Sequence, residues 1–201
     1  MSEAWPVELH GVTESVVTTL GPNDRWNVAA LGLHAPEADT AGGDSDEGPV
    51  TARTWGRTRT WRNFRERGEG YVQFTTDPVT FAEAAMTVRE VSDPVLSSAD
   101  AWTRVTVEEI DAGAEGDTEW VEWALEPVET GVERETVPTT NRGYYAVIEA
   151  TVAASRLDVP AYDRAELETR LDYFADVVER CGGERERAAM ELVRENSSWD
   201  G

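Results

Sequence analysis

The sequence contains no lysine, so all 18 of its basic residues are arginine, whereas aspartate and glutamate together number 40. The formal net charge at pH 7 is −22. Such a charge keeps a protein soluble but destabilises the compact state by self-repulsion. In about 1 M salt the Debye length is roughly 3 Å, so most of this repulsion disappears. An excess of acids without lysine is typical of proteins from the cytosol of salt-loving microbes. We therefore expect a halophilic, cytoplasmic protein; the alternative is an ordinary acidic one.

Cysteine and histidine are also scarce. Cys181 is the only cysteine, which excludes an internal disulfide. It falls at the end of a helical pattern, where we expect a small buried side chain rather than a reactive thiol. His10 and His34 are the only histidines, and neither an HExxH nor a CxxC motif is present, so a metal site has little support.

Long apolar segments are missing as well. No run of about 18 apolar residues occurs, so we expect no membrane-spanning helix. The first residues, MSEAWPVELHGV, lack the basic patch and apolar core of a signal peptide. Hydrophobic residues nevertheless make up 40% of the 201 residues, which is enough for a packed core.

The first two thirds of the chain have the pattern of β-strands. Residues 14–20 and 26–34 flank the turn cluster GPNDR and predict a hairpin, and residues 35–49 form an acidic, glycine-rich loop. Asp77 followed by Pro78 predicts the N-cap and first turn of a helix that runs to Met86. Further strands are expected over residues 50–55, 70–76, 104–110 and 119–126.

The last third has helical periodicity. Tyr144, Ile148 and Val152 stand four residues apart, which predicts one helix. A second helix is indicated by the same kind of spacing in Leu167, Leu171, Phe174 and Val178, and ends at Gly182 and Gly183. A third is expected over residues 184–195. The fold class expected is α+β, a mostly antiparallel β-barrel or sheet followed by packed helices.

Residues 53–67, RTWGRTRTWRNFRER, gather six of the 18 arginines and are called the arginine segment here. Three interpretations compete. The arginines could pair with nearby acids on a solvated helix face. They could bind nucleic acid, although the net charge of −22 opposes approach to a polyanion and no second basic stripe exists. They could also hold a small phosphorylated ligand.

The phosphate interpretation has local features in its favour. A strand ends at Trp55, Gly56 turns the chain, and Thr58 or Thr60 can cap a short helix. The free N–H groups at a helix start attract anions, and arginine binds phosphate through two parallel hydrogen bonds. One phosphate needs about two or three such donors, so the remaining arginines are expected to bridge to acids.

Four segments resemble, in the right order, an archaeal family of unknown function. WNVAALGL resembles its N-x-A-P-x-G strand, and GRTRTWRNF its G-S-x-T-x-x-N helix start. VQFTTDPVTFAEAA resembles its V-x-N-x-T-x-D-P strand and following helix, and NRGYYAVIEATVAASRL its N-R-A-x-x-x-x-I-E-A helix. Members of this family are similar to flavin reductases and pyridoxamine phosphate oxidases. They have the FMN-binding split β-barrel, which is antiparallel and Greek-key-like, and are usually homodimers.

The resemblance implies a split-barrel flavin-binding domain over residues 1–137 and a helical subdomain over 138–201 packed on the barrel. It also implies FMN as cofactor and a set of binding residues. The implied phosphate ligands are Arg57, Thr58, Arg59, Thr60 and Asn63; Asn27, Ala30 and Gly32 would lie along the isoalloxazine ring, and Thr75, Thr76 and Asp77 by the ribityl chain or ring edge. Ala30, Thr58 and Thr75 depart from the family's usual proline, serine and asparagine.

Arg142, Glu149 and Arg156 are seven residues apart and share one face of a helix. They could form intrahelical or interhelical charge pairs, or the helix could close over the flavin and offer Arg142 to the cofactor or substrate.

The function expected is that of an FMN-dependent oxidoreductase, flavin reductase-like, in which flavin carries the electrons and no catalytic residue can be named. The alternatives are a flavin-binding carrier without turnover and a non-flavin protein that meets an acidic partner through the arginine segment.

Overall fold

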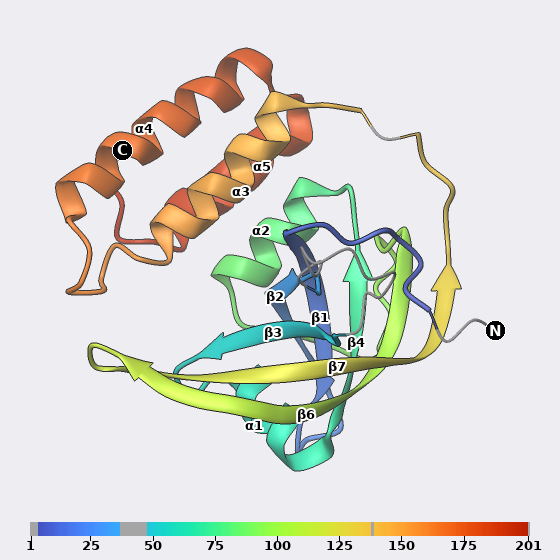
Figure 1. Ribbon diagram of the computed structural model, residues 1–201. Helices are drawn as coiled ribbons and strands as arrows, with labels where there is room; N and C mark the ends of the chain where they lie inside the picture. The colour runs from blue at the N-terminus through green and yellow to red at the C-terminus, as the bar shows by residue number, and fades with distance from the viewer. Residues whose placement is uncertain (1–3, 37–47, 138, 201) are drawn as a thin grey trace, which may run out of the picture. The chain divides into compact units, whose positions relative to one another are not determined.

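The computed structural model describes residues 4–36, 48–137 and 139–200 (Figure 1). Most of the acidic loop predicted over residues 35–49 lies outside the described residues. By its internal contacts the chain forms two units. The first contains the residues up to Phe74 together with Glu90–Glu135, and the second contains Thr75–Arg89 and the residues from Thr136 onward. The segment 75–89 therefore belongs with the helices and not with the barrel sequence that surrounds it.

The first unit is an antiparallel barrel. The hydrogen-bonded order is β1-β4-β6-β7-β3-β2-β5, and an additional β1–β2 pairing closes the ring. This is the α+β split-barrel fold expected from the sequence. Its strands are β1 (Val12–Leu20), β2 (Trp26–His34), β3 (Val50–Trp55), β4 (Glu69–Phe74), β5 (Arg89–Val91), β6 (Ala101–Glu115) and β7 (Thr118–Val132).

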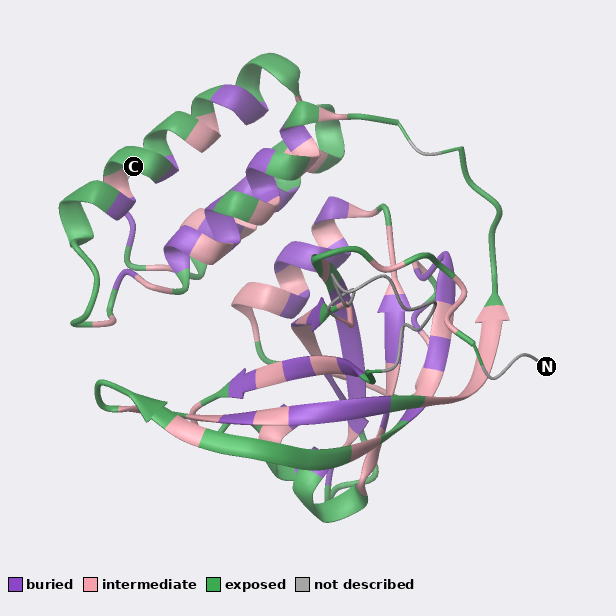
Figure 2. Cartoon of the chain, viewed as in Figure 1, coloured by how far each residue is buried: buried purple, intermediate pink, exposed green. Residues whose placement is uncertain are grey.

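Apolar side chains on alternate positions fill the barrel. β3 alternates buried and less buried residues along its length (Figure 2). On β7, within the strand predicted over residues 119–126, Val121, Trp123 and Leu125 are buried. They share one core with residues of β1, β2, β4 and β6 and with Phe64 of the helix α1 (Arg59–Arg67). The Phe64 and Trp123 rings meet edge to face, with centroids 5.5 Å apart. This contact holds α1 against the barrel.

β6 and β7 are much longer than the sequence predicts. They form a long ribbon in which residues 101–115 pair with residues 118–132, with register shifts between Arg104 and Val105 and between Glu109 and Asp111. Two cross-strand pairs in this ribbon join a tryptophan to a glycine, Trp102 with Gly131 and Trp120 with Gly113. A Cβ atom added to either glycine would lie 2.6 Å from the indole of its partner. In each pair the indole ring lies over the glycine backbone, so a larger residue at either glycine position would clash with it.

Apart from Arg89, where β5 begins, the regular structure described in the second unit is helical. The helices are α2 (Pro78–Met86), α3 (Arg142–Ala154), α4 (Arg164–Cys181) and α5 (Glu184–Glu195). Asp77, Asn141 and Asp163 cap α2, α3 and α4 with their side chains. Leu167, Leu171 and Val178 are buried as predicted.

Two details of the helical unit differ from the sequence prediction. The buried face of α3 is its small-residue face, including Ala146, Val147 and Ala150, while Tyr144, Ile148 and Val152 are only half-buried. The prediction of a buried Cys181 is wrong, because this thiol is exposed. Gly182, the residue after α4, lies against Gly143 of α3. A Cβ atom added to Gly143 would lie only 2.5 Å from the Cα atom of Gly182. This close approach requires glycine at position 143. The neighbouring residue Cys181 has its side chain exposed to solvent.

Candidate functional site

The start of α1 has the local geometry of an anion site. β3 ends at Trp55, and Gly56 adopts a φ of +67° while its N–H donates to the Glu119 carbonyl over 2.7 Å. Thr58 is the N-cap, as expected, and its hydroxyl accepts from the Trp61 N–H over 3.2 Å. The first turn of α1 contains no acidic residue. The helix start therefore offers positive partial charge with no carboxylate of its own turn to neutralise it.

Three predicted site residues come together behind this helix start. The Asn27 amide donates to the Thr60 hydroxyl over 3.4 Å, and the Asn63 amide donates to the carbonyl and hydroxyl of Thr19. Asn27, Thr60 and Asn63 are 6%, 5% and 1% exposed. Their side chains thus tie α1 to the β1–β2 hairpin. Asn63 Oδ1 is buried and has no hydrogen-bond partner among the described residues. An unsatisfied buried acceptor of this kind costs roughly 1–3 kcal/mol unless a water or ligand supplies a donor.

Ala30 and Gly32 do not join this group. The register of β1 with β2 is continuous from Val12 to Leu20, and side chains alternate between the two faces of a strand. Asn27 therefore points to the face of β2 opposite to that of Ala30 and Gly32. Any ligand that lies along Ala30 and Gly32 contacts a different side of this strand from the one that binds α1.

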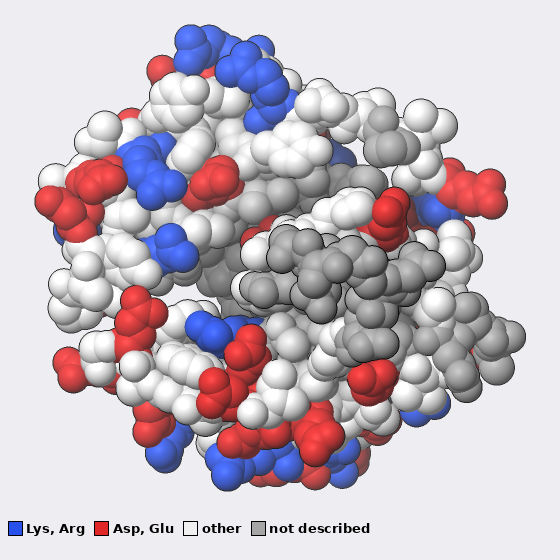
Figure 3. Space-filling model, viewed as in Figure 1, with Lys and Arg blue, Asp and Glu red and all other residues white. Residues whose placement is uncertain are grey.

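Three arginines of the arginine segment are paired with glutamates. Arg53 approaches Glu122 to 3.3 Å, Arg57 approaches Glu119 to 3.2 Å, and Arg59 approaches Glu90 to 2.8 Å. Each glutamate belongs to β5 or β7 and not to α1. Figure 3 shows acidic and basic side chains mixed along the lower edge of the view. The interpretation in which arginines bridge to acids therefore holds for half of the segment.

The other three arginines of the segment, Arg62, Arg65 and Arg67, are exposed. Within the described part of the chain none of them forms an ion pair. Sequence reasoning could not separate these two groups, because the pairing acids Glu90, Glu119 and Glu122 are 31, 62 and 69 residues away from their partners.

The remaining predicted site residues, Thr75, Thr76, Asp77 and Arg142, belong to the second unit. Thr75 accepts a hydrogen bond at its carbonyl from the Tyr144 hydroxyl over 3.0 Å. Arg142 is exposed at the first position of α3.

Asp77 has structural partners that the sequence did not reveal. Its carboxylate accepts two hydrogen bonds from Arg185 of α5, over 2.7 and 2.6 Å, and one from the Thr80 hydroxyl over 2.8 Å. Burial alone would raise the pKa of Asp77, but the hydrogen bonds from Arg185, Thr80 and the Val79 N–H outweigh it and hold this pKa below the ordinary value. The same contact raises the pKa of Arg185. Asp77 is thus charged and joins α2 to α5.

The predicted charge pairing on α3 is interhelical. Glu149 approaches Arg170 of α4 to 3.7 Å, and Arg156 lies over the Tyr162 ring with its guanidinium carbon 5.1 Å from the centroid. Among the residues that the structure describes, no group of three or more His, Cys, Asp or Glu side chains could hold a metal ion. None of the described helices is both long and apolar enough to span a membrane.

Two family models match the chain. Residues 13–134 match the N-terminal domain of "Protein of unknown function (DUF447)", and residues 141–195 match the second DUF447 model. The chain belongs to the DUF447 family. The two matched regions fall on either side of the connection between β7 and α3, so both parts of the chain are typical of the family. No curated protein matches the chain significantly.

Among the solved structures that resemble this chain, one has a TM-score high enough to show the same fold. An FMN-bound DUF447 protein from Methanosarcina mazei is 22% identical, with 94% of this chain and 96% of that chain covered and a TM-score of 0.75. A styrene monooxygenase flavin reductase from Pseudomonas putida S12 is 12% identical, covers 64% of this chain and 93% of its own, and has a TM-score of 0.36. An FMN-binding protein from Thermus thermophilus is 15% identical, with 66% and 82% covered and a TM-score of 0.40. The last two scores are too low to support an argument, whereas the first establishes the fold.

Proposed function

We propose that this DUF447 protein binds FMN and acts as a flavin-dependent oxidoreductase in the cytosol, as a homodimer. The observation that carries the proposal is the similarity over almost the whole chain to the FMN-bound protein of the same family. The start of α1 fits the phosphate of such a cofactor, since the Thr58 cap, the first-turn N–H groups and two flanking arginines lie there.

In this proposal Arg57, Thr58 and Arg59 bind the phosphate directly. Thr60 and Asn63 are buried and hold α1 in position, with the unpaired Asn63 Oδ1 as an acceptor for an ordered water. Ala30 and Gly32 would lie along the ring system, because alanine and glycine leave a flat strand surface. Thr75, Thr76 and Asp77 stay proposed for the ribityl chain or ring edge, and Arg142 stays proposed as a contact to the cofactor or substrate. The flavin supplies the redox chemistry when bound, so no cysteine or histidine is needed for it.

The first experiment is an absorption spectrum of the protein purified in about 1 M salt, before and after heat release of its ligand. A yellow protein that releases one FMN per chain supports the proposal. A colourless protein that takes up no added FMN refutes it and leaves the arginine segment as an anchor or as the docking surface for an acidic partner.

The phosphate assignment needs its own test. We expect Arg59→Gln to weaken FMN binding by roughly tenfold, the usual effect of losing one charge-assisted hydrogen bond. Binding of riboflavin, which lacks the phosphate, should not change. Arg67→Gln is the matched control, because Arg67 is exposed at the opposite end of α1. Equal loss of FMN and riboflavin affinity in Arg59→Gln would argue against phosphate contact.

Turnover is a separate question. Bleaching of the bound flavin by NADH or NADPH, with recovery on addition of an acceptor, supports an oxidoreductase. A flavin that neither donor reduces favours the alternative, a carrier or regulator that binds flavin without turnover.

The halophilic character is also a proposal, supported by the net charge of −22 and the absence of lysine. The free energy of unfolding should rise steeply between about 0.1 and 1 M salt, where the Debye length falls from about 10 to 3 Å.

A further inference from the structure

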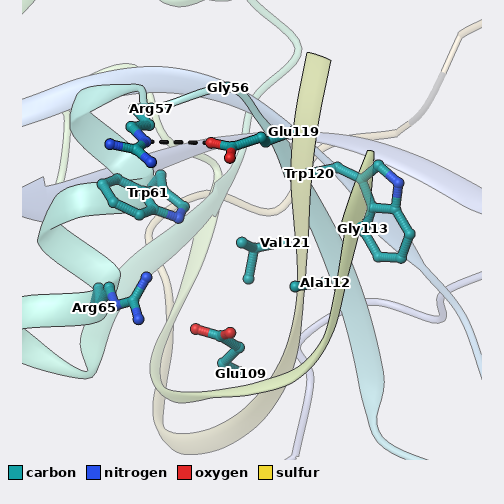
Figure 4. Close-up of a pocket in the computed structure, with 10 residues that line it drawn as sticks. All are labelled: Gly56, Arg57, Trp61, Arg65, Glu109, Ala112, Gly113, Glu119, Trp120 and Val121. Atoms are coloured by element: carbon teal, nitrogen blue, oxygen red, sulfur yellow. Dashed lines mark hydrogen bonds and ion pairs between the residues drawn. The ribbon is translucent and has the colours of Figure 1, made fainter. Parts of the chain in front are cut away.

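A cavity of about 180 Å³ lies in the first unit between α1 and the projecting end of the β6–β7 ribbon (Figure 4). The lining residues that matter here are Arg57, Trp61 and Arg65 at and before α1, and Glu109, Ala112 and Val121 on the ribbon. Thr58 and Arg59, at the start of α1, do not line the cavity. The cavity is therefore a different surface from the proposed phosphate site, although Arg57 borders both.

The floor and one wall of the cavity are apolar. Val121 and Ala112 are cross-strand partners on β7 and β6, and their side chains point into the space (Figure 4). Trp61 faces them from α1, while the ring of Trp120 points away (Figure 4). Small side chains opposite an indole leave a slot, and the preferred occupant of such a slot is a flat ring that stacks on or against the indole.

Arg57, Trp61 and Arg65 follow one another at four-residue spacing, with Arg57 just before the N-cap Thr58 and Trp61 and Arg65 on α1. The guanidinium carbons of Arg57 and Arg65 lie 5.9 and 5.5 Å from the Trp61 ring centroid, one on each side along the helix. Glu119 already pairs with Arg57 over 3.2 Å. Among the described residues, the Arg65 side chain has no ion-pair or hydrogen-bond partner besides its contact with the Trp61 ring, and the Glu109 side chain has no such partner either. Figure 4 shows both side chains on the same side of the cavity, below Trp61 and Val121.

The unpaired groups define what a ligand must carry. Arg65 offers hydrogen-bond donors and a positive charge, which suit a carboxylate in a bidentate contact. Glu109 offers acceptor oxygens, which suit a hydroxyl or amino group. The volume of about 180 Å³ is below the range of about 300–1,000 Å³ typical of sites for drug-sized ligands, so it accommodates one ring rather than a dinucleotide.

We propose that this cavity binds a single-ring aromatic carboxylate that carries a hydroxyl or amino group, with the ring between Trp61 and Val121 and the carboxylate on Arg65. The proposal does not depend on FMN binding. The cavity lies wholly within the barrel unit, and its ligand can be tested with or without flavin present.

The test uses 4-hydroxybenzoate as the probe and saturation-transfer NMR with the full chain, followed by titration of tryptophan fluorescence. We expect binding to the unmodified protein and a loss of affinity of roughly tenfold in Arg65→Gln. Arg67→Gln is the control, since this arginine is exposed on the same helix and does not line the cavity. 4-Hydroxybenzyl alcohol, which lacks the carboxylate, should bind the unmodified protein and Arg65→Gln equally.

A second variant tests the location independently of charge. Ala112 is exposed at the cavity floor, so Ala112→Leu should fill the slot and abolish binding of both probes without disturbing the barrel core. Three outcomes would overturn the proposal: no binding of 4-hydroxybenzoate, equal affinity in Arg65→Gln and Arg67→Gln, or tighter binding of the cation 4-hydroxybenzylamine. Because the measurements are repeated on flavin-free protein, failure of FMN binding leaves their outcome interpretable.

Discussion

Substituting Asp77 by asparagine separates its role as a helix cap from its ion pair. Asparagine caps helices about as well as aspartate, so Asp77→Asn keeps the bond to the Val79 N–H. The substitution removes the negative charge of the carboxylate, which accepts two hydrogen bonds from Arg185. The Asp77 side chain is 17% exposed and that of Arg185 is 62% exposed, so the pair is partly screened. We expect a loss of about 1 kcal/mol in Asp77→Asn, and about 2 kcal/mol in Asp77→Ala, which also loses the cap.

The effect depends on pH with a definite sign. Because the folded-state pKa of Asp77 is lowered from 3.8, its contribution to stability is complete above that value. The contribution disappears as the pH falls through the lower, folded-state pKa. The difference in unfolding free energy between the unmodified protein and Asp77→Asn should therefore be constant above about pH 5 and shrink toward zero below pH 3.8.

The difference in unfolding free energy can be measured by urea unfolding at a constant salt concentration of about 1 M. Far-UV circular dichroism follows the unfolding of the helices. Tryptophan fluorescence should be recorded in parallel, because two units need not unfold in one step. Arg185→Gln and the double variant complete a cycle whose coupling energy isolates the pair. A coupling energy near zero at pH 7, or an unchanged difference well below pH 3.8, would refute the proposed contact.

Three further outcomes test other parts of the structure. Gly131→Ala should lose about 1–3 kcal/mol and change the near-UV dichroism, because its methyl group would collide with the Trp102 indole; unchanged urea unfolding would contradict this packing. Thr58→Ala should lose about 1 kcal/mol by removing the α1 cap, with Thr58→Ser as the control that retains it; equal stability of the two variants would exclude the cap. Cys181 should react with Ellman's reagent in the folded protein, and a requirement for denaturant would show that the thiol is buried after all.

Local patterns were sufficient to predict most helices and strands. The GPNDR turn predicted the β1–β2 hairpin because its residues favour turns, and the observed register joins Leu20 to Trp26 across it. Asp77 with Pro78 predicted the start of α2 for the same local reason, and α2 begins at Pro78. Capping and turn preferences depend on neighbours in sequence, so they can be read without knowing the tertiary structure.

Features that depend on distant contacts could not be predicted. The outer end of the β6–β7 ribbon was missed because the residues of β6 that follow the predicted strand 104–110, beginning with Asp111, are mostly exposed and have no alternating pattern. The exposure of Cys181 depends on the approach of Gly182 to Gly143, which are far apart in sequence. The site residues were predicted by resemblance, and the burial of Thr60 and Asn63 became evident only with α1 placed on the hairpin.

The pairing of the arginine segment explains how so acidic a chain could hold an anion. At a net charge of −22 the long-range field repels a phosphate, and salt screening removes this repulsion without supplying attraction. Binding must therefore come from contacts made at hydrogen-bond distance. Glu119 and Glu90 hold Arg57 and Arg59 beside the start of α1. Because these two arginine side chains are already ordered, they would lose less conformational entropy on binding a phosphate. A guanidinium can donate to a glutamate and to a phosphate at once through its five N–H groups, whereas a lysine offers one point charge. The proposed phosphate site thus relies on the same short-range contacts that anchor α1 to the acidic sheet.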